Sequence, residues 1–271
     1  MAHKIGFTAE FSQEGQASGT YEPRQGHIVP RKSVVQVHFA DRNTSLAYYN
    51  DAFDLKVGDL VYVEGKMEGI RGRVTQLNYN FKIKVSDYRR VIALVDTHVS
   101  GEFFLAGSHF VTFDRETLPK EQAMTWFKAP DAEDVEVVTG SDDDGFFLDD
   151  LGGMKVTQAI AERGREYYMD NRVRYLCLDG NKGYALVEGS ETYQVEFEFH
   201  EGQICGLLCT CFCSYNCKHE FAAMLQLRET LELICQHYAE EFDRSGYFAA
   251  IQKVALFAFA IEGKETGSFK L

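Results

Sequence analysis

Short runs of apolar residues, several of them alternating with polar ones, dominate the first third of the chain. They predict four strands, at Val34–Phe39, Leu60–Glu64, Arg71–Leu77 and Val91–Val95. Because so many short strands follow one another closely, we expect a small β-barrel over residues 31–97, which avoids exposed sheet edges. Residues 1–30 are polar and follow neither the helical nor the strand period, which predicts an N-terminal arm.

We expect residues 98–150 to form a connecting region that contains both strand and helix. Phe103–Phe113 has the composition of a strand, and a short helix is expected at Lys120–Phe127, with Pro119 at its entry. Residues 131–150 contain nine Asp or Glu and no Lys or Arg. We therefore expect an acidic, solvated linker that ends this region.

The pattern of residues 151–271 predicts a helix, a β-meander and further helices. The first helix is expected at Lys155–Arg163 and should stop near Gly164. Gly-containing turns separate four expected strands of an antiparallel meander, at Arg172–Leu178, Tyr184–Glu188, Thr192–Phe199 and Gln203–Cys209. An amphipathic helix is expected over an apolar stripe formed by Met224, Leu227, Leu231, Ile234 and Tyr238. Tyr247–Ile261, in the same helical quarter, is apolar nearly all round, so it should be buried or meet a partner.

The expected fold class is therefore α+β, with an N-terminal barrel and a C-terminal meander. The composition agrees with an ordered protein, because 45% of the 271 residues are hydrophobic and 13% are aromatic. The longest apolar run, Val254–Ile261, is too short to cross a bilayer, and the start of the chain lacks the pattern of a signal peptide. We expect no membrane association and a cytoplasmic protein.

A cluster of cysteines carries the strongest chemical signal. Five of the seven cysteines lie between Cys205 and Cys217, and such a dense group in an intracellular protein is more often metal-binding than disulfide-bonded. A C-x-C pair, five further residues and a C-x-H pair place four ligands within a short segment, which suits tetrahedral zinc. The expected ligands are Cys209, Cys211, Cys217 and His219. Four protein ligands leave no position for water, so the zinc should be structural.

Other roles for the cysteines stay open at this point. Cys213 forms a second C-x-C with Cys211, so it could replace Cys209 or Cys211 as a ligand. The whole group could instead be free or redox-active thiols. Cys177, Cys205 and Cys235 stand at apolar positions of predicted strands or helices, where cysteine behaves as a small hydrophobic residue.

The residues around the cluster resemble the SWIM zinc-finger family. The resemblance extends from Arg163 to Leu227 and rests on Arg163–Tyr168, Arg172–Val173, Ala185–Ser190, Tyr193–Val195 and Cys217–Leu225. It implies a ββα finger with C-x-C and C-x-H ligands. It also implies a DNA-binding or protein-interaction module, often found beside helicase-type ATPases in bacteria. The extra Cys213 and the five-residue spacer depart from the family pattern.

The predicted barrel contains a basic island. Its strand-turn-strand pattern at Asp54–Glu64 and Arg71–Val74 resembles SH3-like barrels of nucleic-acid and ribosome-associated modules. Although the chain has a net charge of −13, which disfavours polyanion binding over the whole surface, basic residues outnumber acidic ones between residues 66 and 90. The basic residues are Lys66, Arg71, Arg73, Lys82, Lys84, Arg89 and Arg90. Tyr79, Phe81 and Tyr88 lie between them, as in surfaces that stack bases, although an ordinary solvated face explains the same pattern.

We expect a binding module rather than an enzyme. The sequence has no phosphate-binding P-loop, no G-x-S-x-G and no H-E-x-x-H motif. The hypothesis is a zinc protein that binds nucleic acid. The alternative is a protein-interaction adaptor whose zinc site is purely structural, with a helicase-type ATPase as one candidate partner.

Overall fold

The computed structural model describes residues 4–7, 30–130, 145–211, 213 and 215–262. These residues form two compact units, one of residues 30–95 and the other of residues 4–7 and 96–262. Each unit contains one antiparallel sheet, and all five described α-helices belong to the larger unit, which confirms the α+β class. Most of the expected N-terminal arm and of the acidic linker lies outside the described residues.

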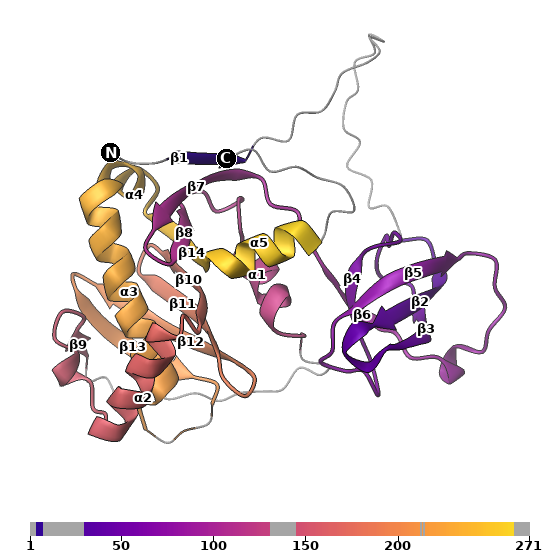
Figure 1. Ribbon diagram of the computed structural model, residues 1–271, viewed down its shortest axis with the longest axis horizontal. Helices are drawn as coiled ribbons and strands as arrows, with labels where there is room; N and C mark the ends of the chain where they lie inside the picture. Colours follow the sequence, from indigo (N-terminus) through magenta and orange to yellow (C-terminus); the bar gives the residue numbers. More distant parts are fainter. Residues whose placement is uncertain (1–3, 8–29, 131–144, 212, 214, 263–271) are drawn as a thin grey trace, which may run out of the picture. The chain divides into compact units, whose positions relative to one another are not determined.

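The smaller unit is a five-stranded antiparallel sheet (Figure 1). Its strand order is β3-β2-β5-β4-β6, with short 3₁₀ turns η1 (Ala40–Arg42) and η2 (Val85–Asp87) in its connections. The strands are β2 (Ser33–Phe39), β3 (Thr44–Asn50), β4 (Leu60–Val63), β5 (Gly72–Asn78) and β6 (Val91–Val95). Alternate residues of β2 point inward, so Val35, Val37 and Phe39 are fully buried in the core of this unit.

A closed barrel is not found in this unit. The ladders end at β3 and β6, and the sheet has an open order. A single parallel bridge between Tyr49 and Arg90 links the end of β3 to the residue before β6. The expectation of a β-rich unit is therefore confirmed, and the small SH3-like barrel stays a prediction. The sequence pattern missed β3, which pairs with β2 along its whole length.

The larger unit is built on a nine-stranded sheet with the order β1-β7-β8-β14-β10-β11-β12-β13-β9. The predicted meander, from β10 to β13, runs from the middle of this order to the strand before its edge, and consecutive strands pair as expected. The strands are β1 (Lys4–Phe7), β7 (Gly101–Ala106), β8 (His109–Thr112), β9 (Phe146–Phe147), β10 (Val173–Asp179), β11 (Lys182–Glu188), β12 (Thr192–His200), β13 (Gln203–Cys209) and β14 (Tyr247–Gln252).

The helical expectation for Tyr247–Ile261 was wrong in its first part. Tyr247–Gln252 is strand β14, which pairs with β8 on one side and with β10 on the other. A central strand buried on both faces is a continuous apolar run, and periodicity alone cannot distinguish it from a buried helix. Only the remainder forms a helix, α5 (Lys253–Glu262).

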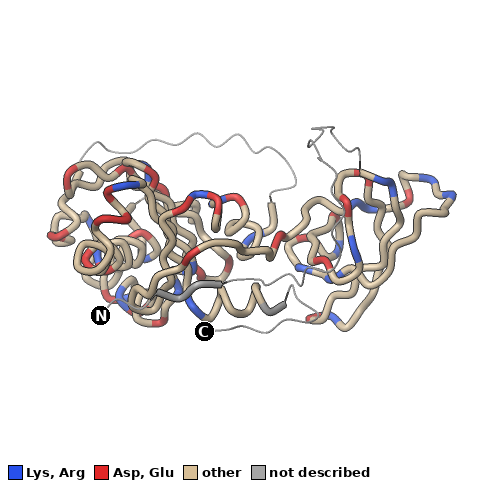
Figure 2. The backbone as a smooth tube through the Cα atoms, turned by 90° about the horizontal axis from the view of Figure 1, so that it is seen from above, with Lys and Arg blue, Asp and Glu red and all other residues tan. Residues whose placement is uncertain are grey.

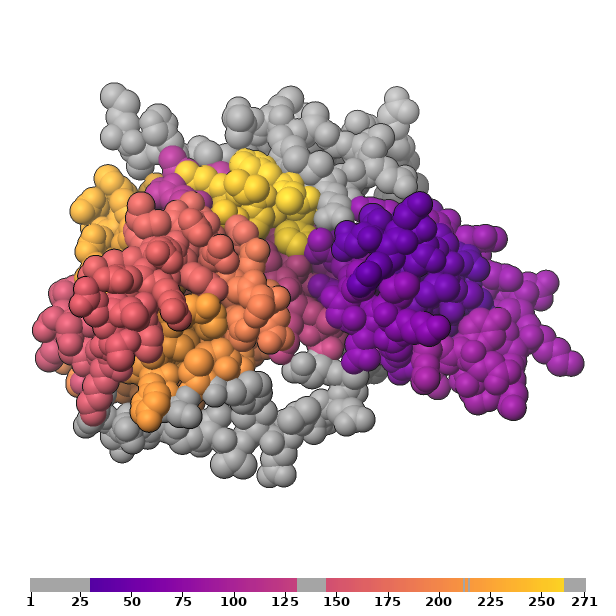
Figure 3. Space-filling view, turned by 60° about the horizontal axis from the view of Figure 1, so that its bottom comes forward, coloured from indigo at the N-terminus to yellow at the C-terminus, as the bar shows by residue number. Residues whose placement is uncertain are grey.

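Five α-helices of the described residues accompany this sheet. They are α1 (Lys120–Phe127), α2 (Gln158–Met169), α3 (Lys218–His237), α4 (Ala239–Ser245) and α5. The stripe residues on α3 pack in one core with Leu176, Ala185 and Val195 of the sheet; they are Met224, Leu227, Leu231 and Ile234. Residues of the α2 region, coloured red to salmon, form much of the face seen in Figure 3. No helix among the described residues is long and apolar enough to cross a membrane.

The predicted end of the helix expected at Lys155–Arg163 was also wrong. Helix α2 continues through Gly164, which is buried. A Cβ atom at residue 164 would lie 2.8 Å from the Cβ of Phe221 in α3. Gly164 therefore allows two helices to approach closely, instead of ending one of them.

Candidate metal centre

The expected metal ligands come from a strand end, a turn and a helix start. Cys209 is the last residue of β13, Cys211 follows in the turn, and His219 lies in the first turn of α3. Cys217 is the N-cap of α3. Its backbone N–H donates to Glu220 Oε2 at 2.6 Å, and the Glu220 N–H donates to Cys217 Sγ at 3.4 Å, which together form a capping box. The cap thus fixes where the helix begins and, with it, the position of two ligands.

The structure brings all four predicted ligands together. Their ligand atoms lie within 4.8 Å of one another. His219 Nδ1 is 3.8 Å from Cys209 Sγ and 3.6 Å from Cys217 Sγ. Tetrahedral zinc with ordinary bond lengths separates its ligand atoms by about 3.5 to 3.8 Å. The two distances from Nδ1 are those of a zinc site, and Nδ1 is the imidazole atom that faces these thiols.

Burial makes the site unfavourable for charge unless a cation is bound. Cys217 and His219 are each 4% exposed. Burial, with a smaller contribution from Lys218, lowers the pKa of His219 to about 4, so its imidazole is neutral and able to bind a metal. Burial raises the pKa of Cys211 to about 12. A hydrogen bond with Cys209, together with burial, raises the pKa of Cys217. A metal ion would supply the positive charge that these thiolates need.

Two tyrosine rings hold the imidazole of His219. Tyr193 of β12 stacks on it with ring centroids 4.1 Å apart, and Tyr167 of α2 approaches edge-on at 5.4 Å. Lys218 and Arg172 lie over Tyr167, at 4.5 Å and 4.6 Å from the ring centroid. Three thiolates and one zinc ion carry a net charge of −1, so these neighbouring cations favour the metal-bound state.

The sequence patterns did not predict that residues other than the four candidate ligands contribute to this site. Tyr167, Gly189 and Tyr193 all lie in the segments that resemble the SWIM family, but the contact with His219 becomes visible only in three dimensions. A Cβ atom at residue 189 would lie 2.7 Å from Tyr193 Cε2 and 3.3 Å from His219 Nε2. Gly189 therefore leaves the space in which the stacked pair sits.

The remaining cysteines lie outside this group. Cys213 is exposed, and although its side chain reaches that of Cys211, it is not one of the four clustered ligands. Cys177 is buried as expected, and Cys205 is half-buried. The expectation that Cys235 belongs to the core was wrong, because its position on α3 faces solvent.

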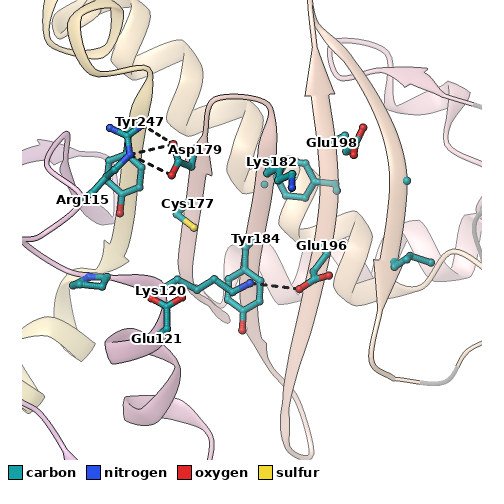
Figure 4. Close-up of a pocket in the computed structure, with 15 residues that line it drawn as sticks. Arg115, Lys120, Glu121, Cys177, Asp179, Lys182, Tyr184, Glu196, Glu198 and Tyr247 are labelled. Atoms are coloured by element: carbon teal, nitrogen blue, oxygen red, sulfur yellow. Dashed lines mark hydrogen bonds and ion pairs between the residues drawn. The ribbon is translucent and has the colours of Figure 1, made fainter. Parts of the chain in front are cut away.

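A pocket of about 540 Å³ opens on the sheet face opposite α3. Cross-strand neighbours form its floor, with Cys177 opposite Tyr184 and Tyr184 opposite Glu196 (Figure 4). Its charged groups are largely paired within the protein: Arg115 binds Asp179, and Lys120 lies 3.5 Å from Glu196 and over the Tyr184 ring. None of the four predicted metal ligands lines it.

The basic island divides into engaged and exposed side chains. Arg73 donates to the Gly58 carbonyl at 2.8 Å, and Arg90 binds Asp51 at 2.6 Å, so both support the fold of the smaller unit. Arg71 is half-buried. Lys66, Lys82, Lys84 and Arg89 are exposed. Tyr79 is 38% exposed, whereas Phe81 and Tyr88 are half-buried.

The fold and the site together define an α+β protein with a Cys₃His group suited to a metal. No family model matches the chain, and no solved structure matches it. Over 69 residues the chain is 39% identical to an uncharacterized protein of Methanocaldococcus jannaschii. This stretch is 26% of the chain and covers only 29% of that protein's length. The similarity therefore shows a shared segment and does not establish a family.

Proposed function

We propose that the chain is a SWIM-type zinc protein whose single zinc ion is structural. The observation that carries this proposal is the convergence of Cys209, Cys211, Cys217 and His219. Their chemistry, three soft thiolates and one imidazole, is that of closed zinc sites. Four protein ligands leave the metal no open position for water. We therefore propose a binding module, with no enzymatic activity.

The zinc ion would join the sheet to helix α3. Cys209 belongs to β13, whereas Cys217 and His219 belong to the start of α3, which packs across the sheet. Metal binding would thus stabilise the contact between these elements, and its free energy would contribute to folding. The test is zinc content by elemental analysis, with one zinc per chain as the expected result. A purified protein that folds fully without metal would contradict a structural role.

We further propose that the smaller unit binds nucleic acid. The support is electrostatic: residues 30–95 contain eleven Lys or Arg and seven Asp or Glu, whereas the whole chain has a net charge of −13. In Figure 2, Lys and Arg recur along the backbone of the smaller unit, while Asp and Glu are frequent in the larger one. A local positive surface attracts phosphates even on an acidic protein.

Binding to labelled oligonucleotides at low salt tests this part of the proposal. Fluorescence anisotropy should show retention without cleavage, and affinity should fall linearly with salt on a log-log scale. Absence of retention at low salt, where screening is weakest, would exclude nucleic acid as the partner.

The second candidate function is a protein-interaction adaptor. The larger unit supports it, because Val254 at the start of the apolar helix α5 is 70% exposed. A helicase-type ATPase is one partner that the SWIM resemblance implies. Pull-down from native lysate before and after nuclease treatment separates the two functions. A partner protein that survives nuclease treatment would favour the adaptor.

A further inference from the structure

We propose that Arg31 and Tyr79 form a composite stacking platform on the smaller unit, and that this platform receives an unpaired base of single-stranded nucleic acid. The Arg31 guanidinium carbon lies 4.2 Å from the centroid of the Tyr79 ring. Both side chains are exposed, and Tyr79 keeps 38% of its surface accessible. This inference rests on the proposed nucleic-acid function and names the site and the substrate class.

Strand pairing places Arg31 beside the basic island, from which it is distant in sequence. Antiparallel pairing of β2 with β5 ends where Val34 lies opposite Asn78. The residues before β2 therefore start beside those that follow β5. Arg31 and Lys32, both exposed, thus add two positive charges where Tyr79 emerges from the sheet.

The segment after β5 presents its lysines to solvent. Phe81 and Ile83 are half-buried, whereas Lys82 and Lys84 between and after them are exposed. The Phe81 ring packs edge-on against the buried Tyr49, with ring centroids 6.2 Å apart. This contact anchors the segment, so that its lysines project outward.

The charges of this surface are available to a ligand. Arg31, Lys82 and Lys84 make no ion pair within the part of the chain that the structure describes. Arg73 and Arg90 differ, because they are held by Gly58 and Asp51. Phosphates would therefore be contacted by the first group and not by the second.

The geometry favours a single strand over a duplex. A guanidinium plane and an aromatic ring both stack on bases, and only an unpaired base exposes the face that such stacking needs. Exposed lysines beside an aromatic platform are the combination found where proteins follow a single-stranded backbone without reading its sequence. We therefore expect little dependence on base sequence.

Fluorescence anisotropy on the full-length zinc-loaded protein tests the platform. The probes are labelled oligo-dT, labelled oligo-U and a labelled duplex, each of about 16 nucleotides. This length is the upper end of the site sizes of single-strand-binding OB-fold domains. Tyr79→Ala should weaken binding of the single strands about 5- to 150-fold, and Tyr79→Phe should retain it. Arg31→Ala should weaken binding and lower the salt slope by about 0.7.

Arg42→Ala is the matched control, because Arg42 is an exposed arginine beyond the opposite end of β2. It should leave both affinity and salt slope close to wild type. A double variant provides a second criterion: in a Tyr79→Ala background, the effect of Arg31→Ala should be smaller than in the wild type, because the two residues act as one unit.

The outcomes distinguish this inference from the proposed function. If the wild type binds single strands while Tyr79→Ala and Arg31→Ala bind like Arg42→Ala, the platform is wrong and nucleic-acid binding stands. If the wild type prefers the duplex, the assigned substrate class is wrong. If the wild type retains no probe at low salt, the proposed function and the platform both fail.

Discussion

The ring of Tyr193 lies nearly parallel to the imidazole of His219, at an interplanar angle of 18°. This stack comes from two elements far apart in sequence, strand β12 and the first turn of α3. The Tyr193 hydroxyl is hydrogen-bonded to the Ser190 hydroxyl at 2.8 Å, which fixes the ring from its other end. The imidazole therefore has little freedom to rotate away from the three thiols.

Replacing Tyr193 should weaken zinc binding without removing a ligand. In Tyr193→Ala the imidazole loses its stacking partner, and we expect zinc affinity to fall about 10-fold or more, as when groups that orient metal ligands are removed. Tyr193→Phe keeps the stacked ring and loses only the hydrogen bond to Ser190, so its zinc affinity should fall less than that of Tyr193→Ala. Competition with a chromogenic chelator measures the affinity. Tyr215→Ala is the control, because Tyr215 lies between the ligand pairs and is 82% exposed. Equal losses in both alanine variants would contradict the orienting role.

Cysteine variants should distinguish the cysteines that bind zinc from those that do not. Cys217→Ser should lose the metal, because it removes a buried thiolate and part of the cap of α3. Cys213→Ser should keep one zinc per chain, since Cys213 is exposed and outside the group of four. Elemental analysis of the purified variants checks both results. Loss of zinc from Cys213→Ser with retention in Cys209→Ser or Cys211→Ser would show that Cys213 is a ligand instead.

Removal of zinc should affect the two units differently. The candidate metal site lies in the larger unit, and structural zinc sites contribute on the order of 10 kcal/mol to folding. A strong chelator should therefore unfold α3 and the meander, while the smaller unit, with its separate core, should persist. Hydrogen exchange followed by mass spectrometry, with and without chelator, measures this by segment. Uniform loss of protection in both units would contradict the prediction.

Gly164→Ala should destabilise the larger unit although alanine favours helices. The added methyl group would lie 2.8 Å from Phe221 Cβ and 3.1 Å from the Lys218 carbonyl oxygen. Overpacking costs about 1 to 3 kcal/mol, which offsets or exceeds the roughly 1 kcal/mol gained from helix propensity. Thermal unfolding of the zinc-loaded protein measures the difference. Ala159→Gly is the control: because Ala159 is exposed on the same helix, this variant measures the effect of helix propensity without a packing contact. If Gly164→Ala is more stable than the wild type by as much as Ala159→Gly is less stable, the close contact with Phe221 does not exist.

Histidine 109 should make the protein less stable in acid. His109 is fully buried, its Nε2–H donates to the Val173 carbonyl at 2.8 Å, and Nδ1 accepts from the Ser108 hydroxyl at 2.9 Å. Burial is the main cause that lowers the pKa of His109 to about 4 from an ordinary value near 6.5. Between these two pH values the unfolded chain binds a proton that the folded chain does not, so stability falls as pH falls through this window.

The full effect of His109 is on the order of 3 kcal/mol and should be complete below about pH 4. In His109→Gln the free energy of unfolding should therefore decline less between pH 6.5 and 4 than in the wild type. Denaturant titrations at several pH values measure the difference. His98→Gln, which replaces an exposed histidine, is the control and should follow the wild type. If the free energy of unfolding of His109→Gln declines as much as that of the wild type, His109 is not the cause of the acid sensitivity.

The local patterns of the sequence predicted the elements that depend on neighbouring residues. The meander strands follow from alternation and Gly-containing turns, and the helical character of α3 follows from the spacing of its apolar stripe. The group of four candidate ligands was predictable because residues with this spacing in one short segment can converge on a single metal ion. Their convergence in the structure agrees with that spacing.

Only the tertiary structure decided the features that join distant segments. Tyr247–Gln252 becomes a strand because β8 and β10 offer it two edges to pair with, which no local period reveals. Phe221 packs so closely against α2 that position 164 has no room for a Cβ atom, and Tyr193 stacks on His219 because β12 passes beside the start of α3. Arg31 reaches Tyr79 because antiparallel pairing of β2 with β5 brings together residues 48 positions apart. Sequence spacing specifies local geometry, whereas side-chain contacts between segments depend on how the sheet orders its strands.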